Sequence, residues 1–171
     1  MIFDLNNFID GDEYSYQLEG ELKSEDQLKG SDIRIIDPIK FKGEIFKVDS
    51  TCHLHIDINY TYESKCDRCL KPTMNEISTV LSGELKENKG KYNDEDELDE
   101  MIIYYENNLL NLNEYIWSQV VSSLPMKILC SYDCKGLCFK CGIDMNTQSC
   151  DCSKNAIDPR LEKLKELFPK K

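Results

Sequence analysis

Residues 50–62, "STCHLHIDINYTY", carry the pattern that decides the fold. Apolar and polar side chains alternate here, so that one face of a strand would carry Cys52, Leu54, Ile56 and Ile58 and the other His53, His55, Asp57 and Asn59. A period of two residues is typical of a β-strand with one buried and one solvated face. The stretch therefore predicts a half-buried strand, with Cys52 as a buried free thiol on its apolar side.

Weaker versions of the same pattern lie on both sides of this stretch. They are "EYSYQLEGEL" (13–22), "IRIIDPIKFKGEIFKVD" (33–49) and "MNEISTVLSGELKE" (74–87). Several strands separated by short polar breaks favour an antiparallel sheet or a partly open barrel. We therefore expect such a sheet over roughly residues 13–87.

The pattern changes to a helical one in "NLNEYIWSQVVSSLPMK" (111–127). Apolar residues recur there every four positions, which predicts a long helix over residues 112–124. Asn111 and Glu114 have the spacing of a capping box at its start. Pro125 is expected to end the helix, because its ring cannot continue the hydrogen-bond pattern.

Two further segments complete the predicted organisation. In "IDPRLEKLKELFPKK" (157–171), an Asp-Pro pair at the start predicts a short C-terminal helix. Residues 88–100 carry six acidic residues in their last seven positions, which predicts a solvated loop, or alternatively a docking patch for a basic partner. We thus predict an α+β fold, with a β-rich body over residues 1–125 and a cysteine-rich segment with the short helix over residues 126–171.

Length and charge limit the class of protein. A chain of 171 residues suits one domain with a small appendage. The N-terminal "MIFDLNNFIDGDEY" has no basic leader, and no run of about 18 apolar residues occurs, so we expect a cytoplasmic protein without a membrane partner. Residues 1–125 have a net charge of −14 and residues 126–171 of +3. Any contact with nucleic acid is therefore expected near the cysteine-rich end.

Cysteines are the strongest chemical signal. Six of the nine lie in "CSYDCKGLCFKCGIDMNTQSCDC" (130–152). In a reducing compartment, closely paired cysteines indicate metal binding ahead of redox thiols or disulfides. A structural zinc site takes four Cys or His ligands. Eight cysteines form four close pairs, namely Cys66 with Cys69, Cys130 with Cys134, Cys138 with Cys141, and Cys150 with Cys152.

The pairs can combine in two ways. One arrangement binds two Zn²⁺ ions, with Cys138, Cys141, Cys150 and Cys152 around one and Cys66, Cys69, Cys130 and Cys134 around the other. The rival arrangement binds one Zn²⁺ through Cys134, Cys138, Cys141 and either Cys150 or Cys152. Neither needs His53 or His55. Gly142, directly after Cys141, is expected to supply the positive φ that such a turn favours.

Basic residues near the cysteines have two interpretations. Four thiolates and one Zn²⁺ leave a formal charge of −2, which nearby cations would offset. A nucleic-acid contact is the alternative. The residues concerned are Lys135, Lys140, Lys154, Arg160 and Lys163.

The chain resembles the YceD family of bacterial and plastid proteins. The resemblance lies in "CDRCLKP" (66–72), "LPMKILCSYDCKGLCFKCGIDMN" (124–146), "CDC" (150–152) and "DPRLEKLKEL" (158–167). The chain departs from it at Phe139, where relatives usually carry proline. The resemblance implies a role in the accumulation or processing of 23S rRNA and carries over the eight cysteine ligands. It implies no chemical reaction.

Together these observations favour a non-enzymatic, zinc-binding ribosome-biogenesis factor. Its expected partner is the 23S rRNA precursor or a large-subunit assembly protein, contacted through Arg68, Lys71, Phe139 and Lys140. A zinc-ribbon transcription or DNA-binding protein is the alternative, although the acidic body disfavours it. A thiol redox protein is another, although zinc would block its thiolates. No phosphate-binding glycine loop or hydrolase motif occurs, so we expect no enzyme and no small-molecule substrate.

Overall fold

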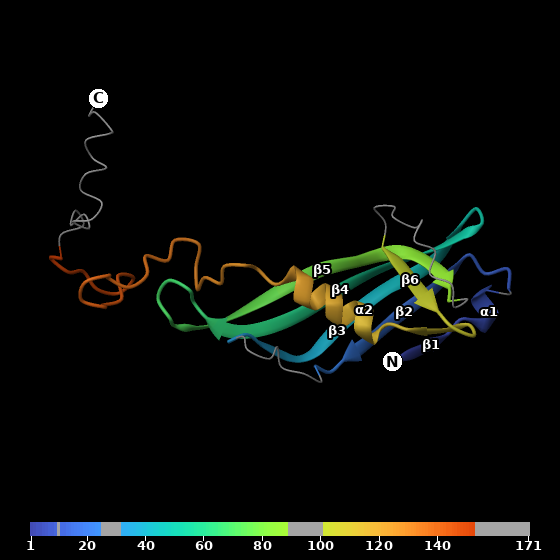
Figure 1. Ribbon diagram of the computed structural model, residues 1–171, viewed down its shortest axis with the longest axis horizontal. Coiled ribbons are helices and arrows are strands. Elements are labelled where there is room, and N and C mark those ends of the chain that lie inside the picture. Colours follow the sequence, from blue (N-terminus) through green and yellow to red (C-terminus); the bar gives the residue numbers. More distant parts are fainter. Residues whose placement is uncertain (10, 25–31, 89–100, 153–171) are drawn as a thin grey trace, which may run out of the picture.

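A long, twisted β-sheet forms the body of the protein. The computed structural model describes residues 1–9, 11–24, 32–88 and 101–152. Its main sheet has five strands in the order β2-β3-β4-β5-β6 (Figure 1). These are β2 (Ser15–Leu22), β3 (Arg34–Val48), β4 (Thr51–Lys65), β5 (Pro72–Glu87) and β6 (Ile102–Tyr105).

Strand β4 lies at the centre of the main sheet. It pairs antiparallel with both β3 and β5, and Ile56 stands opposite Gly43 and Leu81. The alternation predicted the buried face correctly at Leu54, Ile56 and Ile58, and buried Tyr60 and Tyr62 continue the same face. Cys52, in contrast, is only half-buried, because it is the second residue of the strand and lies near the end of the sheet. Its thiol is free.

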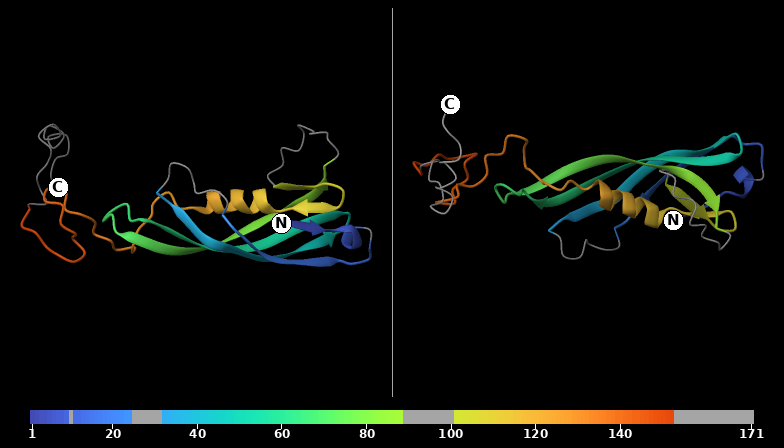
Figure 2. Two further views of the ribbon diagram at one scale, coloured as in Figure 1. Left: turned by 90° about the horizontal axis from the view of Figure 1, so that it is seen from below. Right: turned by 45° about the horizontal axis from the view of Figure 1, so that its top comes forward.

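Smaller elements cover one face of the sheet. They are β1 (Ile2–Asp4), α1 (Asn6–Ile9), β7 (Leu109–Asn111) and α2 (Asn113–Ser123), and β1 pairs with β7 in a two-stranded sheet. Figure 2 shows α2 lying along this face. Ile116 and Val120 of α2 and Phe8 of α1 enter the same apolar core as the buried face of β4.

The prediction of an α+β fold with one long helix is wrong. The described part of the chain is mostly β, and α2 has only 11 residues. Strand β7 extends to Asn111, so Leu112 takes the N-cap position and makes no side-chain capping bond. Pro125 ends the helix as expected, since Leu124 before it is extended.

Over residues 13–87 the sheet is antiparallel, as predicted, and a further strand from outside that range joins it at one edge. Strand β6 pairs in parallel with β5, with Glu84 opposite Ile102. The strand order places β2 and β6 at the two edges, which makes an open sheet rather than a barrel. The predicted helix in 157–171 and residues 89–100 of the acidic segment lie outside the described residues. Neither α1 nor α2, the helices of the described residues, has the length or hydrophobicity of a membrane span.

Candidate metal centres

The first centre joins the β4–β5 turn to the segment that follows α2. The turn closes when the Leu70 N–H donates to the Cys66 carbonyl, at 2.9 Å. Asp67 then holds the later segment on both sides of Ile128. Its N–H donates to the Ile128 carbonyl at 2.8 Å, and its carboxylate accepts from the Ile128 N–H at 2.7 Å. Buried Ile128 thus brings the following cysteines to the turn.

Four sulfur atoms meet at this junction, from Cys66, Cys69, Cys130 and Cys134. All lie within 4.8 Å of one another. The Sγ atoms of Cys66 and Cys134 are 3.8 Å apart, and those of Cys69 and Cys130 are 3.5 Å apart. A tetrahedral metal with bonds of about 2.3 Å to sulfur separates its ligands by about 3.8 Å, whereas a disulfide bond is about 2.05 Å. The spacing therefore fits a four-coordinate metal ion, and all but Cys130 are buried.

A second centre forms within the C-terminal segment from Cys138, Cys141, Cys150 and Cys152. Its turn repeats the first, because the Gly142 N–H donates to the Cys138 carbonyl at 2.8 Å. Gly142 has a φ of 75°, the positive value expected from its position. Cys150 Sγ lies 3.5 Å from Cys138 Sγ. This centre is more open to solvent than the first, because only Cys138 is buried.

The eight cysteines therefore gather in the two groups of the first arrangement considered from the sequence. Cys134 belongs to the first group. The one-ion alternative would require Cys134 to lie with Cys138 and Cys141 instead, and it does not. Neither histidine belongs to a group. His53 stacks on Phe46 with ring centroids 5.9 Å apart, and His55 is exposed.

Backbone N–H groups favour the thiolate form at one cysteine of each centre. Burial raises the pKa of the Cys66 thiol, but N–H groups, that of Cys130 foremost, outweigh burial and lower this pKa to about 6. The N–H groups of its own turn, at Cys141 and Lys140, lower the pKa of Cys138 to about 6. Each centre thus contains one sulfur that is a ready metal ligand near neutral pH.

Neighbouring sulfurs have the opposite effect on a second cysteine of each centre. The sulfur of Cys69 is the main cause that raises the pKa of Cys130 to about 12. That of Cys141 does the same for Cys152, also to about 12. Four thiolates so close together repel one another, and a bound dication removes this repulsion. The donor set and its electrostatics therefore fit a metal ion.

Two of the predicted contact residues have structural partners. Arg68 Nη1 donates to the Cys134 carbonyl at 2.7 Å. Lys71 forms an ion pair with Asp144, with Nζ and Oδ2 2.5 Å apart, and this ion pair raises the pKa of Lys71 and lowers that of Asp144. Phe139 and Lys140 remain exposed, with Lys140 Nζ 6.0 Å from the Phe139 ring centroid.

Sequence reasoning missed three polar residues of the site, Asp67, Asp144 and Asn146. The amide of Asn146 donates to Cys134 Sγ at 3.4 Å, so a residue of the second centre's loop contacts a ligand of the first. The signal was available, because Asp and Asn at "IDMN" form local hydrogen-bonded turns. Their partners outside that turn could not be read from the sequence.

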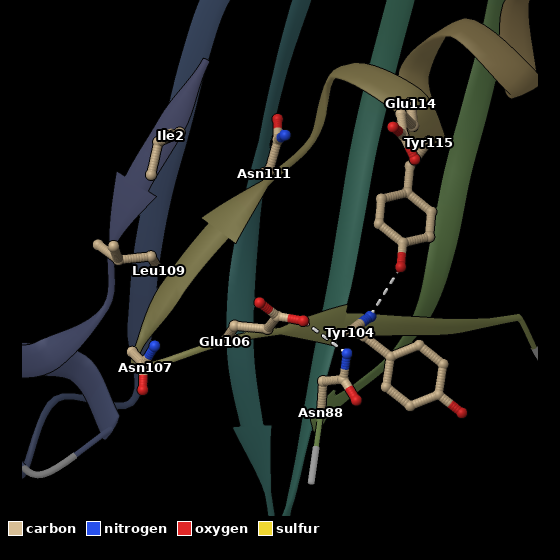
Figure 3. Close-up of a pocket in the computed structure, with 9 residues that line it drawn as sticks. All are labelled: Ile2, Asn88, Tyr104, Glu106, Asn107, Leu109, Asn111, Glu114 and Tyr115. Atoms are coloured by element: carbon tan, nitrogen blue, oxygen red, sulfur yellow. Dashed lines mark hydrogen bonds between the residues drawn. The ribbon is translucent and has the colours of Figure 1, made fainter. Parts of the chain in front are cut away.

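The cysteine-rich segment lies beyond the turn between β4 and β5, at the opposite end of the sheet from β1 and α1 (Figure 1). A cavity of about 440 Å³ lies near that opposite end, between β6, β7 and the start of α2 (Figure 3). There the Tyr104 N–H donates to the Tyr115 hydroxyl at 2.9 Å, and Asn88 Nδ2 donates to Glu106 at 2.6 Å. None of the predicted site residues lines this cavity.

Comparison with known proteins gives one family. The family model described as "Large ribosomal RNA subunit accumulation protein YceD" matches residues 54–168. "Large ribosomal RNA subunit accumulation protein YCED homolog 1, chloroplastic" of Arabidopsis thaliana is 31% identical over 49 residues, which are 29% of this chain and 15% of that protein. Uncharacterized proteins of Mycobacterium bovis and Mycobacterium tuberculosis are 29% identical over 104 residues, 61% of this chain and 49% of each. The chain thus spans half or less of the length of these curated relatives, and no solved structure matches it.

Proposed function

The chain belongs to the YceD family, and from this membership we propose that it is a zinc-binding, non-enzymatic factor that promotes accumulation or processing of 23S rRNA during ribosome biogenesis. The observation that carries the proposal is the extent of the family match. Residues 54–168 include the β4–β5 turn, α2 and all eight clustered cysteines. The matched region is therefore the part of the molecule where both candidate centres lie.

Zinc is the metal that these donors favour. Each centre offers four sulfur ligands at tetrahedral spacing, which suits Zn²⁺ better than the oxygen-seeking Mg²⁺ or Ca²⁺. With all four positions filled by the protein, no position remains open for a water or a substrate. Zinc would then act as a structural cross-link, and the chain would work by binding rather than by catalysis.

The cysteine-rich end supplies a surface suited to unpaired RNA. Phe139 and Tyr132 are 71% and 93% exposed, and Lys140 lies beside the Phe139 ring. Exposed aromatic rings stack on bases, and adjacent cations attract the phosphate backbone. The acidic body would repel bulk RNA, so that only this local contact persists. We propose the 23S rRNA precursor as the partner.

The test replaces the two proposed contact residues and keeps all eight clustered cysteines. Stacking on one base contributes about 1–3 kcal/mol, so a Phe139→Ala/Lys140→Glu variant is expected to lose at least about fivefold in association with precursor large-subunit particles. Co-sedimentation and crosslinking to rRNA measure this loss, and elemental analysis should show unchanged zinc. The matched control is Tyr14→Ala/Lys42→Glu, which removes an exposed aromatic ring directly before β2 and an exposed cation on β3, and it should leave association unchanged.

Two results would contradict parts of the proposal. Normal co-sedimentation of the double variant would place the contact elsewhere, with docking of the acidic segment 94–100 on a basic ribosomal protein as the next hypothesis. Absence of any crosslink between the wild-type chain and precursor rRNA would argue for a protein partner. Arg68 and Lys71 are left unchanged, because the Arg68 side chain holds the Cys134 carbonyl within the first centre and Lys71 pairs with Asp144 in the loop of the second.

A further inference from the structure

We propose that the two metal centres are coupled, with Asn146 as the positioning residue that lets metal binding at the second centre strengthen metal binding at the first. The inference rests on the proposed binding of zinc but goes beyond it. If the two zinc sites were independent, metal binding at one would not change the metal affinity of the other. The contacts between these two sites predict that it does.

Asn146 belongs to the loop of one centre and contacts a ligand of the other. It lies between Cys141 and Cys150 in the chain, so its position depends on closure of the second centre. Its Nδ2 donates to Cys134 Sγ at 3.4 Å, and its Oδ1 accepts from the Lys135 N–H at 2.8 Å. Because both ends of the amide are engaged, its N–H group is aimed at the sulfur.

A local turn fixes the backbone beneath this amide. The Asn146 N–H donates to the Asp144 carboxylate at 2.9 Å, and its Nδ2 donates to the same oxygen at 2.7 Å. The other carboxylate oxygen of Asp144 pairs with Lys71, two residues after Cys69 of the first centre. Asp144 therefore holds Asn146 and the β4–β5 turn at once.

A backbone contact also ties the two turns together. The Leu137 N–H donates to the Arg68 carbonyl at 3.0 Å. Gly136 has a φ of 75°, and a Cβ there would come within 2.9 Å of the same carbonyl. Glycine at this position thus permits the close approach that brings the second centre against the first.

These contacts have a direct consequence for metal affinity. An N–H group that donates to a thiolate spreads its negative charge and fixes its orientation, and loss of such a partner typically lowers metal affinity about 10–100-fold. If the second centre is empty, the loop that carries Asn146 is no longer closed by its cysteines. The first centre should then bind metal more weakly. Linkage requires the reverse effect to have the same size.

Cobalt(II) titration of the full chain under anaerobic, reducing conditions tests the coupling. Cys66→Ser/Cys69→Ser leaves only the second centre, and Cys150→Ser/Cys152→Ser leaves only the first. We expect the wild-type curve to be tighter than the sum of these two single-centre curves, by about tenfold at the first centre. A wild-type curve equal to the sum would overturn the proposal.

Asn146→Ala tests the assigned residue with all eight ligands in place. This variant should bind two Co²⁺ ions with a curve equal to the sum, and its sulfur-to-metal charge-transfer band should move to lower energy because one thiolate has lost its donor. Gln148→Ala, in the same loop, should behave like the wild type. Coupling that persists in Asn146→Ala, with an unmoved band, would refute the role of this residue.

Failure of the underlying proposal would look different. If the wild-type chain binds no Co²⁺ at either centre, metal binding itself is refuted, and the coupling with it. Far-UV circular dichroism of each variant verifies that the sheet is intact.

Discussion

At the scale of single residues, Leu70 and Gly142 occupy the same place in two similar turns. Each directly follows the second cysteine of a Cys-x-x-Cys pair and donates its N–H to the carbonyl of the first. Their φ angles are 60° and 75°. Gly142 could be predicted from the sequence, because glycine is the usual residue at positive φ. Leu70 could not, because leucine is uncommon there and gives no such signal.

The two positions predict opposite effects of substitution. Positive φ costs a non-glycine residue about 1–2 kcal/mol, while glycine adds about 0.5–1 kcal/mol of unfolded-state entropy. Leu70→Gly should therefore raise the free energy of unfolding by up to about 1 kcal/mol. Gly142→Ala should lower it by about 1 kcal/mol through the backbone alone, since a Cβ there meets nothing within 4 Å. Urea unfolding of the metal-loaded chain measures both, and a loss of stability in Leu70→Gly would contradict the argument.

At the scale of elements, pattern length decided what the sequence could predict. Strand β4 has 15 residues, enough for its alternation to identify the buried face. Strands β6 and β7 have four and three residues, too few to show a period. The signal that could have found them is Asn107–Asn108, two residues with φ of 50° and 58° that turn the chain between β6 and β7. Because that turn was not recognised in the sequence, the two short strands were not predicted and a long helix was expected in this region.

Tyr60 fixes α2 to the sheet. Its ring is buried on β4, and its hydroxyl donates to the Val120 carbonyl at 3.1 Å and lies 2.8 Å from Ser123 Oγ. Both partners belong to the last turn of the helix. One side chain of the central strand therefore holds the last turn of α2 against the sheet. This position also fixes the point from which the chain continues toward the first centre.

Removal of this hydroxyl should loosen the helix end. Tyr60→Phe keeps the ring but loses the hydrogen bonds, and a net loss of about 1 kcal/mol in the free energy of unfolding is expected. Hydrogen exchange should quicken at the last turn of α2. Tyr132→Phe, at a residue that is 93% exposed, is the matched control and should change neither quantity. Equal effects of the two substitutions would show that the Tyr60 hydroxyl has no anchoring role.

At the scale of the whole molecule, the described residues form two separate buried clusters. The large apolar core lies between the main sheet and its covering elements, whereas Cys66, Cys69 and Cys134 form a small cluster of their own. The cysteine spacing was enough to suggest both groups of four. The roles of Arg68 and Lys71 were not predictable, because their partners Cys134 and Asp144 lie more than 60 residues away in the sequence.

Metal removal should therefore act on one part of the molecule. A strong chelator is expected to speed amide hydrogen exchange in residues 66–71 and 126–152, because the proposed metal ions would link binding to local folding there. The central strands β3 and β4 should keep their protection, since their core contains none of the eight clustered cysteines. Exchange measured by mass spectrometry with and without chelator provides the comparison. A uniform increase along the chain would mean that body and centres unfold as one unit.

The junction at the first centre also sets an order of events during synthesis. Cys66 and Cys69 precede their partners Cys134 and Cys130 by 68 and 61 residues. At about 5–20 residues per second, the earlier pair is made roughly 3–14 seconds before the later pair exists. During that interval the β4–β5 hairpin can form, but Cys66 and Cys69 lack the other two cysteines of their group. Their thiols can then be oxidised, or can bind a metal ion with only two of the four ligands present. Translation rate and thiol protection therefore bear on the yield of correctly joined protein.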